Sequence, residues 1–277
     1  MLNYHKNHIF KFMPFGVNAL KTLIKNELWF GSPQNLNDPF ESHFEINFKG
    51  GELPSNDVLT KYYKEELQNK NAIIDKVLYC SLDTNYFLKD VKEAILKSLK
   101  DKTGICSFSK SYLNTKMWSH YADSHKGICL IFDRKLLEEN FKTANLKIIE
   151  TEIEYCDSLH SIEVSFNNNK ILINNLDRHK IITTKLNDWV EESEIRFSID
   201  FFNSNHYRNI PFDKKALKGI IFGENTEIDT KNTLGHLFRE RKGFIWAEAY
   251  KNYIIGKMDV KYIHPNSNKY SNNIFNY

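Results

Sequence analysis

Hydrophobic and polar positions change period several times near the start of the chain, which predicts a quick succession of short elements. IFKFM (9–13) alternates with the period of a strand and places Lys11 on the face opposite its two flanking phenylalanines. VNALKTLIKNE (17–27) has apolar residues at helical spacing. LWFG (28–31) predicts a second strand, and SPQNLNDPF (32–40) has the prolines and polar residues of a turn-rich loop.

The rest of the chain predicts a polar helical stretch, followed by strands that are separated by single helices. Within the amphipathic stretch 56–100, VLYCSLD (77–83) fits either a buried strand or part of a helix. This order lacks regular β-α-β alternation, so it favours an α+β fold with mixed, mostly antiparallel sheets and intervening helices. Helices are expected at 116–125, 168–188 and 229–241, and strands at 104–109, 127–133, 145–156, 194–202, 216–223, 244–250 and 258–263.

Length and composition are those of one globular domain. The 277 residues suit a single catalytic-type α+β domain over 1–263, with a helical insertion at about 55–100 and a loop-like C-terminal tail at 264–277. Hydrophobic residues make up 41% of the chain, which excludes a mostly disordered protein. Lysine and arginine total 38 against 35 acidic residues. This balance argues against a dedicated nucleic-acid coat, although one basic cleft needs only a few cations.

Cysteine and histidine spacing gives no metal-binding signature. The four cysteines form no C-x-x-C pair, which argues against a zinc ribbon or a redox dithiol. His120, Asp123 and His125 lack the i, i+4 spacing of helical zinc ligands, so no metal is expected there. Because the chain shows neither a secretory signal nor an apolar window of membrane length, we expect a reduced, cytoplasmic protein with no membrane partner.

Two clusters of polar and aromatic residues are candidates for a site. In NDPFE, Asn37 and Asp38 are typical of a turn, whereas Glu41 is free to point into a cleft. In CSFS, the period of two places both serines, Ser107 and Ser109, on one face of a strand, where hydroxyls orient a ligand or bond to backbone.

An aromatic pair follows in KMWSHYADSH (116–125). Trp118 and Tyr121 are three positions apart on the predicted helix and are expected to share a face. That face either packs in the core or forms an aromatic wall for a flat ring such as nicotinamide or adenine.

Charged residues on two predicted strands are further candidates. In WVEESEIRF, Glu192, Glu194 and Arg196 are expected on the same side of a strand. They form either a solvated face with ion pairs or a carboxylate pair of the kind that cleaves glycosidic bonds. Lys185, on the preceding predicted helix, would add positive charge. Lys11 either meets a diphosphate or guards an edge strand against aggregation.

Several of these strings resemble a bacterial family catalogued as a domain of unknown function (number two-nine-seven-one). The matching pattern comprises L-W-F-G-S-P-x-x-L-N-D-P-F-E, S-F-S, M-W-S-H-Y-A-D-x-H-x-G-I-C-x-x-F-D, W-x-x-E-x-E-x-R and G-I-I-F-G. It extends from Phe10 to Gly223 and so covers most of the chain.

The chain also resembles ADP-ribosyltransferases, in which strands with a basic residue, S-x-S and E-x-E follow one another. This resemblance implies an ADP-ribosyltransferase-like fold and NAD as substrate, and Lys11 stands where an arginine or histidine is usual. Glu194 would bind the ribose next to nicotinamide and stabilise an oxocarbenium-like transition state, and Glu192 would prepare the nucleophile. The resemblance also implies that Ser107 and Ser109 contact the ribose and that Lys11 faces the diphosphate. Tyr121 or Trp118 would stack on nicotinamide.

Three hypotheses about function remain open. The first is an NAD-consuming ADP-ribosyltransferase or glycohydrolase, acting as a bacterial toxin or anti-phage defence effector. Its acceptor would be an unknown nucleic acid or protein, and its partners the proteins of a defence operon. The second is a metal-dependent nuclease that binds Mg²⁺ through Asp38, Glu41, Glu192 and Glu194, with Lys185 nearby. The third is a non-enzymatic binding or sensor module of a defence system, in which the aromatic cluster around Trp118 binds a ligand or a partner helix.

Overall fold

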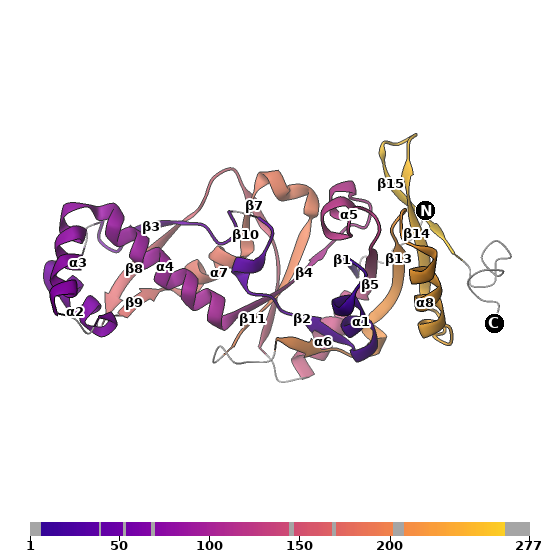
Figure 1. Cartoon of the computed structure of the whole chain (residues 1–277), viewed down its shortest axis with the longest axis horizontal. Helices are drawn as coiled ribbons and strands as arrows, with labels where there is room; N and C mark the ends of the chain where they lie inside the picture. The colour runs from indigo at the N-terminus through magenta and orange to yellow at the C-terminus, as the bar shows by residue number, and fades with distance from the viewer. Residues whose placement is uncertain are drawn as a thin grey trace.

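An eight-stranded sheet joins strands that are far apart in the sequence (Figure 1). The computed structural model describes residues 7–38, 40–51, 54–67, 70–143, 147–167, 170–201 and 208–263. Neighbouring strands of this sheet are antiparallel except for one parallel pair, so the predicted mixed, mostly antiparallel α+β class is confirmed. In spatial order the strands are β15 (Lys257–Tyr262), β14 (Ile245–Asn252), β13 (Leu217–Phe222), β5 (Ile128–Asp133), β1 (His8–Met13), β4 (Thr103–Ser109), β11 (Glu194–Asp200) and β6 (Ile148–Glu152).

Strand β1 lies in the middle of this sheet. It pairs with β5 along its whole length, from His8 opposite Asp133 to Met13 opposite Ile128, and with β4 on its other side. The interpretation of Lys11 as an edge-strand guard is therefore wrong. Strand β11 pairs with β4 over all seven residues, and the strands that carry Lys11, the S-x-S motif and Glu194 are thus neighbours.

Helices cover both faces of the sheet because each face carries its own apolar cluster. One cluster contains residues of α1 (Val17–Lys25), α6 (Arg134–Thr143) and α8 (Ile228–Phe238), with Phe108, Phe132 and Phe197 of the strands in edge-to-face contact. The opposite cluster contains residues of α5 (Thr115–Tyr121), where Trp118 packs edge-on against Phe12.

A third apolar cluster is formed by elements that lie at one end of the molecule (Figure 1). It is built from α2 (Asn56–Glu66), α3 (Lys70–Leu82) and α4 (Thr84–Lys102), and from a smaller sheet of β3 (Glu45–Phe48), β8 (Ser161–Asn167) and β9 (Lys170–Ile173). Helix α4 buries Phe87, Val91, Ile95 and Leu99, a stripe with a spacing of four. VLYCSLD (77–83) lies almost wholly in α3, so it is helical and not a strand.

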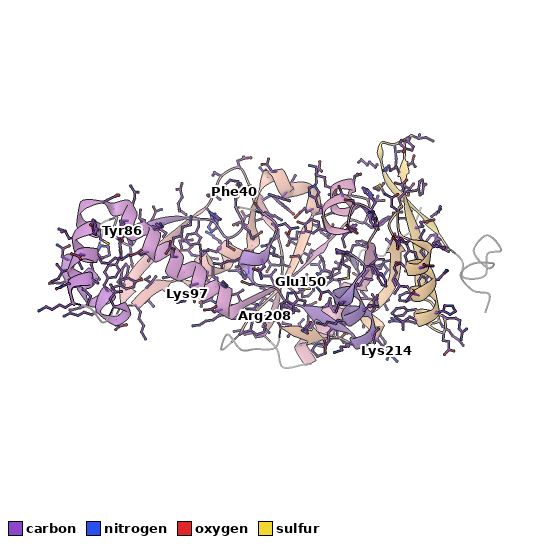
Figure 2. All side chains as sticks on the ribbon, viewed as in Figure 1. Phe40, Tyr86, Lys97, Glu150, Arg208 and Lys214 are labelled. Atoms are coloured by element: carbon purple, nitrogen blue, oxygen red, sulfur yellow. The ribbon has the colours of Figure 1, made fainter. Side chains whose placement is uncertain are left out.

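Helix α4 runs directly into β4 and so links this end to the central sheet. Arg208, which Figure 2 labels at this junction, donates to the carbonyl oxygens of Lys100 (3.0 Å), Thr103 (3.0 Å) and Phe30 (3.2 Å). These contacts fix the start of β4 against the segment that follows β2 (Glu27–Trp29). Strand β12 (Asn209–Pro211) pairs with β2, and two short 3-10 helices are η1 (Pro33–Asn35) and η3 (Lys214–Ala216).

Two expectations about the middle of the chain are wrong. The predicted helix at 168–188 is shorter: Asn174 caps α7 (Asn175–Thr183), and the chain is then extended in β10 (Thr184–Leu186), so Lys185 lies on a strand. The predicted strand at 145–156 is divided into β6 and β7 (Glu154–Cys156), because β7 leaves the central sheet to pair with β10. The predicted tail at 264–277 lies outside the described residues. Among the described helices, none has the length and apolar character that a membrane span requires.

Candidate functional site

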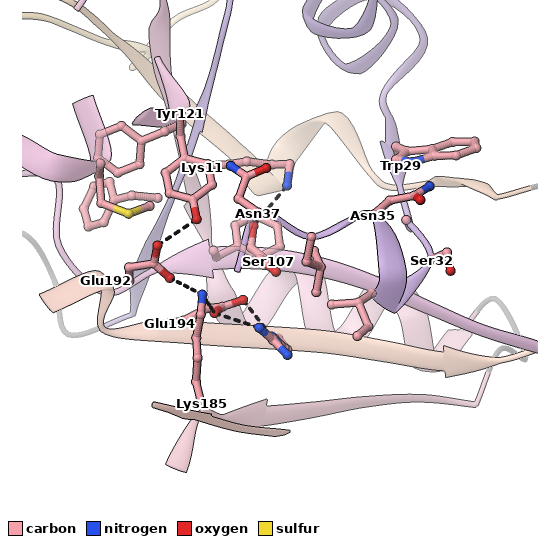
Figure 3. A pocket seen from close by; sticks show the side chains of 18 residues that line it. Lys11, Trp29, Ser32, Asn35, Asn37, Ser107, Tyr121, Lys185, Glu192 and Glu194 are labelled. Atoms are coloured by element: carbon pink, nitrogen blue, oxygen red, sulfur yellow. Dashed lines mark hydrogen bonds and ion pairs between the residues drawn. The ribbon is translucent and has the colours of Figure 1, made fainter. Parts of the chain in front are cut away.

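A pocket of about 260 Å³ opens where β1, β4 and β11 meet the segment 29–37 and helix α5 (Figure 3). This volume is near the lower end for small-molecule sites, so a dinucleotide would extend beyond it. The polar residues of the lining are Lys11, Ser32, Asn35, Asn37, Ser107, Tyr121, Lys185, Glu192, Glu194 and Arg196. Its apolar lining consists of Phe10, Phe12, Trp29, Leu36, Ile105, Phe108 and Met117, together with Gly31.

Arg196 holds two buried carboxylates at the base of the pocket. Its Nε and Nη2 donate to the two oxygens of Glu194 at 2.7 and 3.0 Å. On its other side, Nη1 and Nη2 donate to the two oxygens of Glu41 at 2.7 and 2.9 Å. Nη1 also donates to the Ile182 carbonyl oxygen at 2.8 Å, so these bonds occupy all five guanidinium N–H groups. Glu41 lies behind Arg196 and does not line the pocket.

The carboxyl group of Glu194 is ionised at neutral pH. Burial by itself raises the pKa of this group, but the charge and hydrogen bonds of Arg196 and the charge of Lys185 outweigh burial and lower the pKa to about 2. The pKa of Arg196 is raised for the matching reason, because two carboxylates outweigh its own desolvation. The pocket thus contains a buried negative charge that is fixed in position.

Lys185 connects Glu194 to a second carboxylate. Its amine donates to Glu192 at 2.6 Å and to Glu194 at 3.4 Å, and it lies 4.6 Å from the ring centre of Trp189. The Tyr121 hydroxyl donates to the other oxygen of Glu192 at 2.7 Å, as Figure 3 shows. Burial and the neighbouring carboxylates raise the pKa of Tyr121, so this phenol stays protonated. Tyr121, Glu192, Lys185 and Glu194 form one connected chain of polar groups.

Glu192 reaches this chain from a turn. It is the last residue of the 3-10 helix η2 (Asn187–Glu192), and Ser193 next to it has left-handed backbone angles, with φ 46° and ψ 53°. The expectation that both glutamates lie on one strand is therefore wrong, although their carboxylates still meet at Lys185. The Ser109 hydroxyl donates to the Glu192 carbonyl oxygen at 2.7 Å, and the Glu194 amide donates to the Tyr155 hydroxyl at 2.9 Å.

Lys11 contributes a positive charge to the pocket wall. Its amine donates to the Ser107 carbonyl oxygen at 3.0 Å and lies 5.1 Å from the ring centre of Phe108. Within the described part of the chain, no carboxylate lies within ion-pair distance of it. The buried Ser107 hydroxyl has no hydrogen-bond partner within 3.5 Å among the described residues, yet it is close enough to Glu194 to help lower the pKa of that carboxyl.

Some predicted site residues lie outside the pocket. Trp118 is fully buried, and its indole N–H donates to the Tyr112 carbonyl oxygen at 2.8 Å. Tyr121, at the last position of α5, packs against the same apolar cluster as Trp118, as the expected shared face predicts, but only Tyr121 also lines the pocket. Asp38 accepts from the Phe40 amide at 2.8 Å, as in a turn, and Ser109 binds backbone.

The lining residues that sequence reasoning missed include Trp29, Ser32 and Asn35. All three lie in the L-W-F-G-S-P-x-x-L-N string, which resembles a family motif but which offers no charged residue to suggest chemistry. The alternation of β2 contained a usable signal: Leu28 and Phe30 are buried, so the period of two turns the Trp29 side chain the other way.

Comparison with known proteins gives one partial match. Residues 117–197 match the model of a family described as a protein of unknown function (DUF2971), which supports the family resemblance seen in the sequence. The matched stretch includes Tyr121, Lys185 and both pocket glutamates, whereas Lys11 and NDPFE lie outside it. No curated protein and no solved structure matches the chain. The resemblance to ADP-ribosyltransferases therefore depends on the residues themselves.

Proposed function

We propose that this protein cleaves the bond between nicotinamide and ribose in NAD, as an ADP-ribosyltransferase or NAD glycohydrolase with an ADP-ribosyltransferase-like sheet. One observation carries the proposal: Lys11, Ser107 and the ionised Glu194 come from three neighbouring strands and line the same pocket. In the sequence these residues are separated by almost two hundred positions, and each belongs to a different string of the resemblance.

The chemistry of NAD suits a fixed carboxylate. When the bond between ribose C1′ and the nicotinamide nitrogen breaks, both electrons move to the positively charged nitrogen, so the leaving group needs no proton. Positive charge develops on the ribose, and a preorganised carboxylate stabilises it. An ionised carboxylate has about four acceptor positions, and Arg196 and Lys185 use three of those on Glu194. One position remains for a ribose hydroxyl.

The other polar groups have complementary roles in this proposal. Each oxygen of Glu192 accepts one bond, from Tyr121 or Lys185, so the carboxylate retains capacity to take a proton from water or an acceptor. The Tyr121 ring would pack on nicotinamide, and Lys11 would face the diphosphate because no carboxylate among the described residues pairs with its charge. Such a protein would act as a toxin or defence effector by consuming NAD or by modifying a macromolecule.

The nuclease hypothesis receives less support from the same geometry. Glu41 and Glu194 direct their oxygens at Arg196, and Glu192 directs one at Lys185, so these carboxylates already neutralise protein cations. Asp38 binds the backbone of its own turn. Among the described residues, no three His, Cys, Asp or Glu side chains gather in a way that would hold a metal ion.

The test is release of nicotinamide from NAD by the purified full-length protein. Replacement of Glu194 by glutamine keeps the shape but removes the charge, and we expect release to fall by roughly 10²- to 10³-fold. Glu248→Gln is the matched control. Glu248, on β14, is a buried glutamate that forms ion pairs with Lys231 and Lys261 and lies outside the pocket. Circular dichroism of each variant checks that it is folded.

The proposal makes a clear distinction between these variants. Wild type and Glu248→Gln should release nicotinamide at comparable rates, while folded Glu194→Gln should not. Absence of release from the wild-type protein, or equal release from folded Glu194→Gln, would overturn the proposed function.

A further inference from the structure

One end of the pocket has no role in the cleavage chemistry described above. Figure 3 draws Trp29, Ser32 and Asn35 at the end opposite Tyr121 and Glu192, with Lys11 and Ser107 between. These three residues come from a single short segment that leaves β2 and enters η1. We call them the Trp29 subsite.

The Trp29 subsite has an exposed aromatic side chain next to backbone that is bonded to the central sheet. The Trp29 side chain is 52% exposed, although it lines a pocket and its neighbours Leu28 and Phe30 are fully buried. Two residues on, Gly31 exchanges both backbone hydrogen bonds with Ile105 of β4, each 2.8 Å long. The backbone beside Trp29 is therefore tied to the central sheet, and the exposed indole offers a face on which a flat ligand can stack.

The subsite also contains a buried hydroxyl that has no partner. Ser32 is only 7% exposed, and its Oγ meets no hydrogen-bond partner among the described residues. It stands at the N-cap position of η1, yet its side chain does not cap that helix. A hydroxyl that is buried without a partner is unfavourable, and a polar ligand in the pocket would satisfy it.

Asn35 adds a side-chain amide to the same end. An amide presents a donor and an acceptor side by side, which is the pattern that pairs with the N6 amino group and the N7 acceptor of adenine. A stacking indole, an amide and an unpartnered hydroxyl together suit a purine base and its ribose better than an apolar ligand or an inorganic ion.

We propose that the Trp29 subsite binds the adenine nucleoside part of the ligand, with the base stacked on Trp29, its edge read by Asn35 and a polar group bonded to Ser32. This inference deepens the proposed function, because it assigns the second half of NAD to a particular wall of the pocket. It explains why the L-W-F-G-S-P-x-x-L-N string contains residues that the cleavage chemistry does not use.

Binding of AMP to the full-length protein tests the subsite without any turnover. AMP lacks nicotinamide, so its dissociation constant, measured by calorimetry, reports the adenine end alone. We expect Trp29→Ala to weaken AMP binding by about 5- to 150-fold, the loss expected for one base stacked on an aromatic ring. Trp29→Phe should recover part of the affinity, and Ser32→Ala should weaken binding more modestly. Tyr253→Ala is the control, because Tyr253 is 86% exposed and lies outside the pocket.

The outcomes separate this inference from the proposed function. If AMP binds and folded Trp29→Ala or Trp29→Phe loses affinity while NAD is not cleaved, the subsite stands and the proposed function fails. If NAD is cleaved but AMP does not bind, or binds the folded Trp29 variants as it binds wild type, the subsite is wrong and the proposed function stands. Equal losses in Tyr253→Ala would also overturn the subsite.

Discussion

Replacement of Arg196 by methionine should destabilise the protein strongly, because this guanidinium forms ion pairs with two buried carboxylates, those of Glu41 and Glu194. Arg196 is 1% exposed and donates to both oxygens of Glu41 and of Glu194. Methionine preserves much of the volume but leaves two negative charges in the interior, of which Glu194 keeps only Lys185 at 3.4 Å. Loss of one partner from a buried ion pair typically costs about 3–5 kcal/mol.

Proton uptake sets a second scale for this loss. Protonating a carboxylate above its pKa costs about 1.4 kcal/mol for each pH unit between the pKa and the solution pH. For an ordinary pKa of about 4.3, the cost at pH 7 is about 4 kcal/mol. In the Arg196→Met variant, a buried carboxylate that has lost its partner can be neutralised in this way, so the loss of unfolding free energy at pH 7 should lie near 4 kcal/mol. Protonation becomes less costly as the pH falls, and the deficit should shrink to about 1 kcal/mol per carboxyl at pH 5.

Urea unfolding followed by circular dichroism at pH 7 and pH 5 measures both quantities. Arg134→Met is the control, because Arg134 forms ion pairs with Glu150 and Glu152 but its side chain is 31% exposed. We expect that change to cost less than about 1 kcal/mol at either pH. A loss below about 1 kcal/mol for Arg196→Met at pH 7, or a deficit that does not shrink at pH 5, would refute this account of the buried array.

Two further predictions concern the pocket carboxylates. The folded-state pKa of Glu194 is lowered from 4.5 to about 2, so its contribution to stability is present above the unfolded pKa and is lost as the pH falls from 4.5 to about 2. Acid unfolding of wild type and of Glu194→Gln measures the difference between their unfolding free energies. As the pH falls through this window, that difference should decrease by roughly 3 kcal/mol. A difference that stays constant would contradict the lowered pKa. Tyr121→Phe removes the hydroxyl that donates to Glu192 and should leave the melting temperature within a few degrees of wild type while slowing nicotinamide release about tenfold. A release rate equal to wild type would show that this hydrogen bond does not position Glu192.

The sequence allows good prediction of individual strands and much poorer prediction of what packs beside them. The alternation around Lys11, Ser107 and Glu194 identifies three real strands, because burial on a sheet has a period of two. Their adjacency depends on pairing across almost two hundred residues, which no local pattern contains. The same reason hides Glu41 as the partner of Arg196, 155 positions away.

Local backbone geometry explains the remaining differences at the site. Ser193 adopts left-handed angles that few non-glycine residues favour, so Glu192 ends a 3-10 helix where the pattern predicts a strand. Trp118 and Tyr121 pack against the same apolar cluster, but only Tyr121, at the end of α5, also reaches the pocket. In both places the identity of the site residues is predictable, whereas their orientation depends on tertiary packing.

A crystal structure of the Glu194→Gln variant with bound NAD gives the most direct test of the central claim. We predict that the ribose attached to nicotinamide lies within hydrogen-bond distance of position 194, with nicotinamide beside Tyr121 and the diphosphate beside Lys11. NAD bound at another surface, or bound in the pocket with both riboses far from position 194, would contradict the claim.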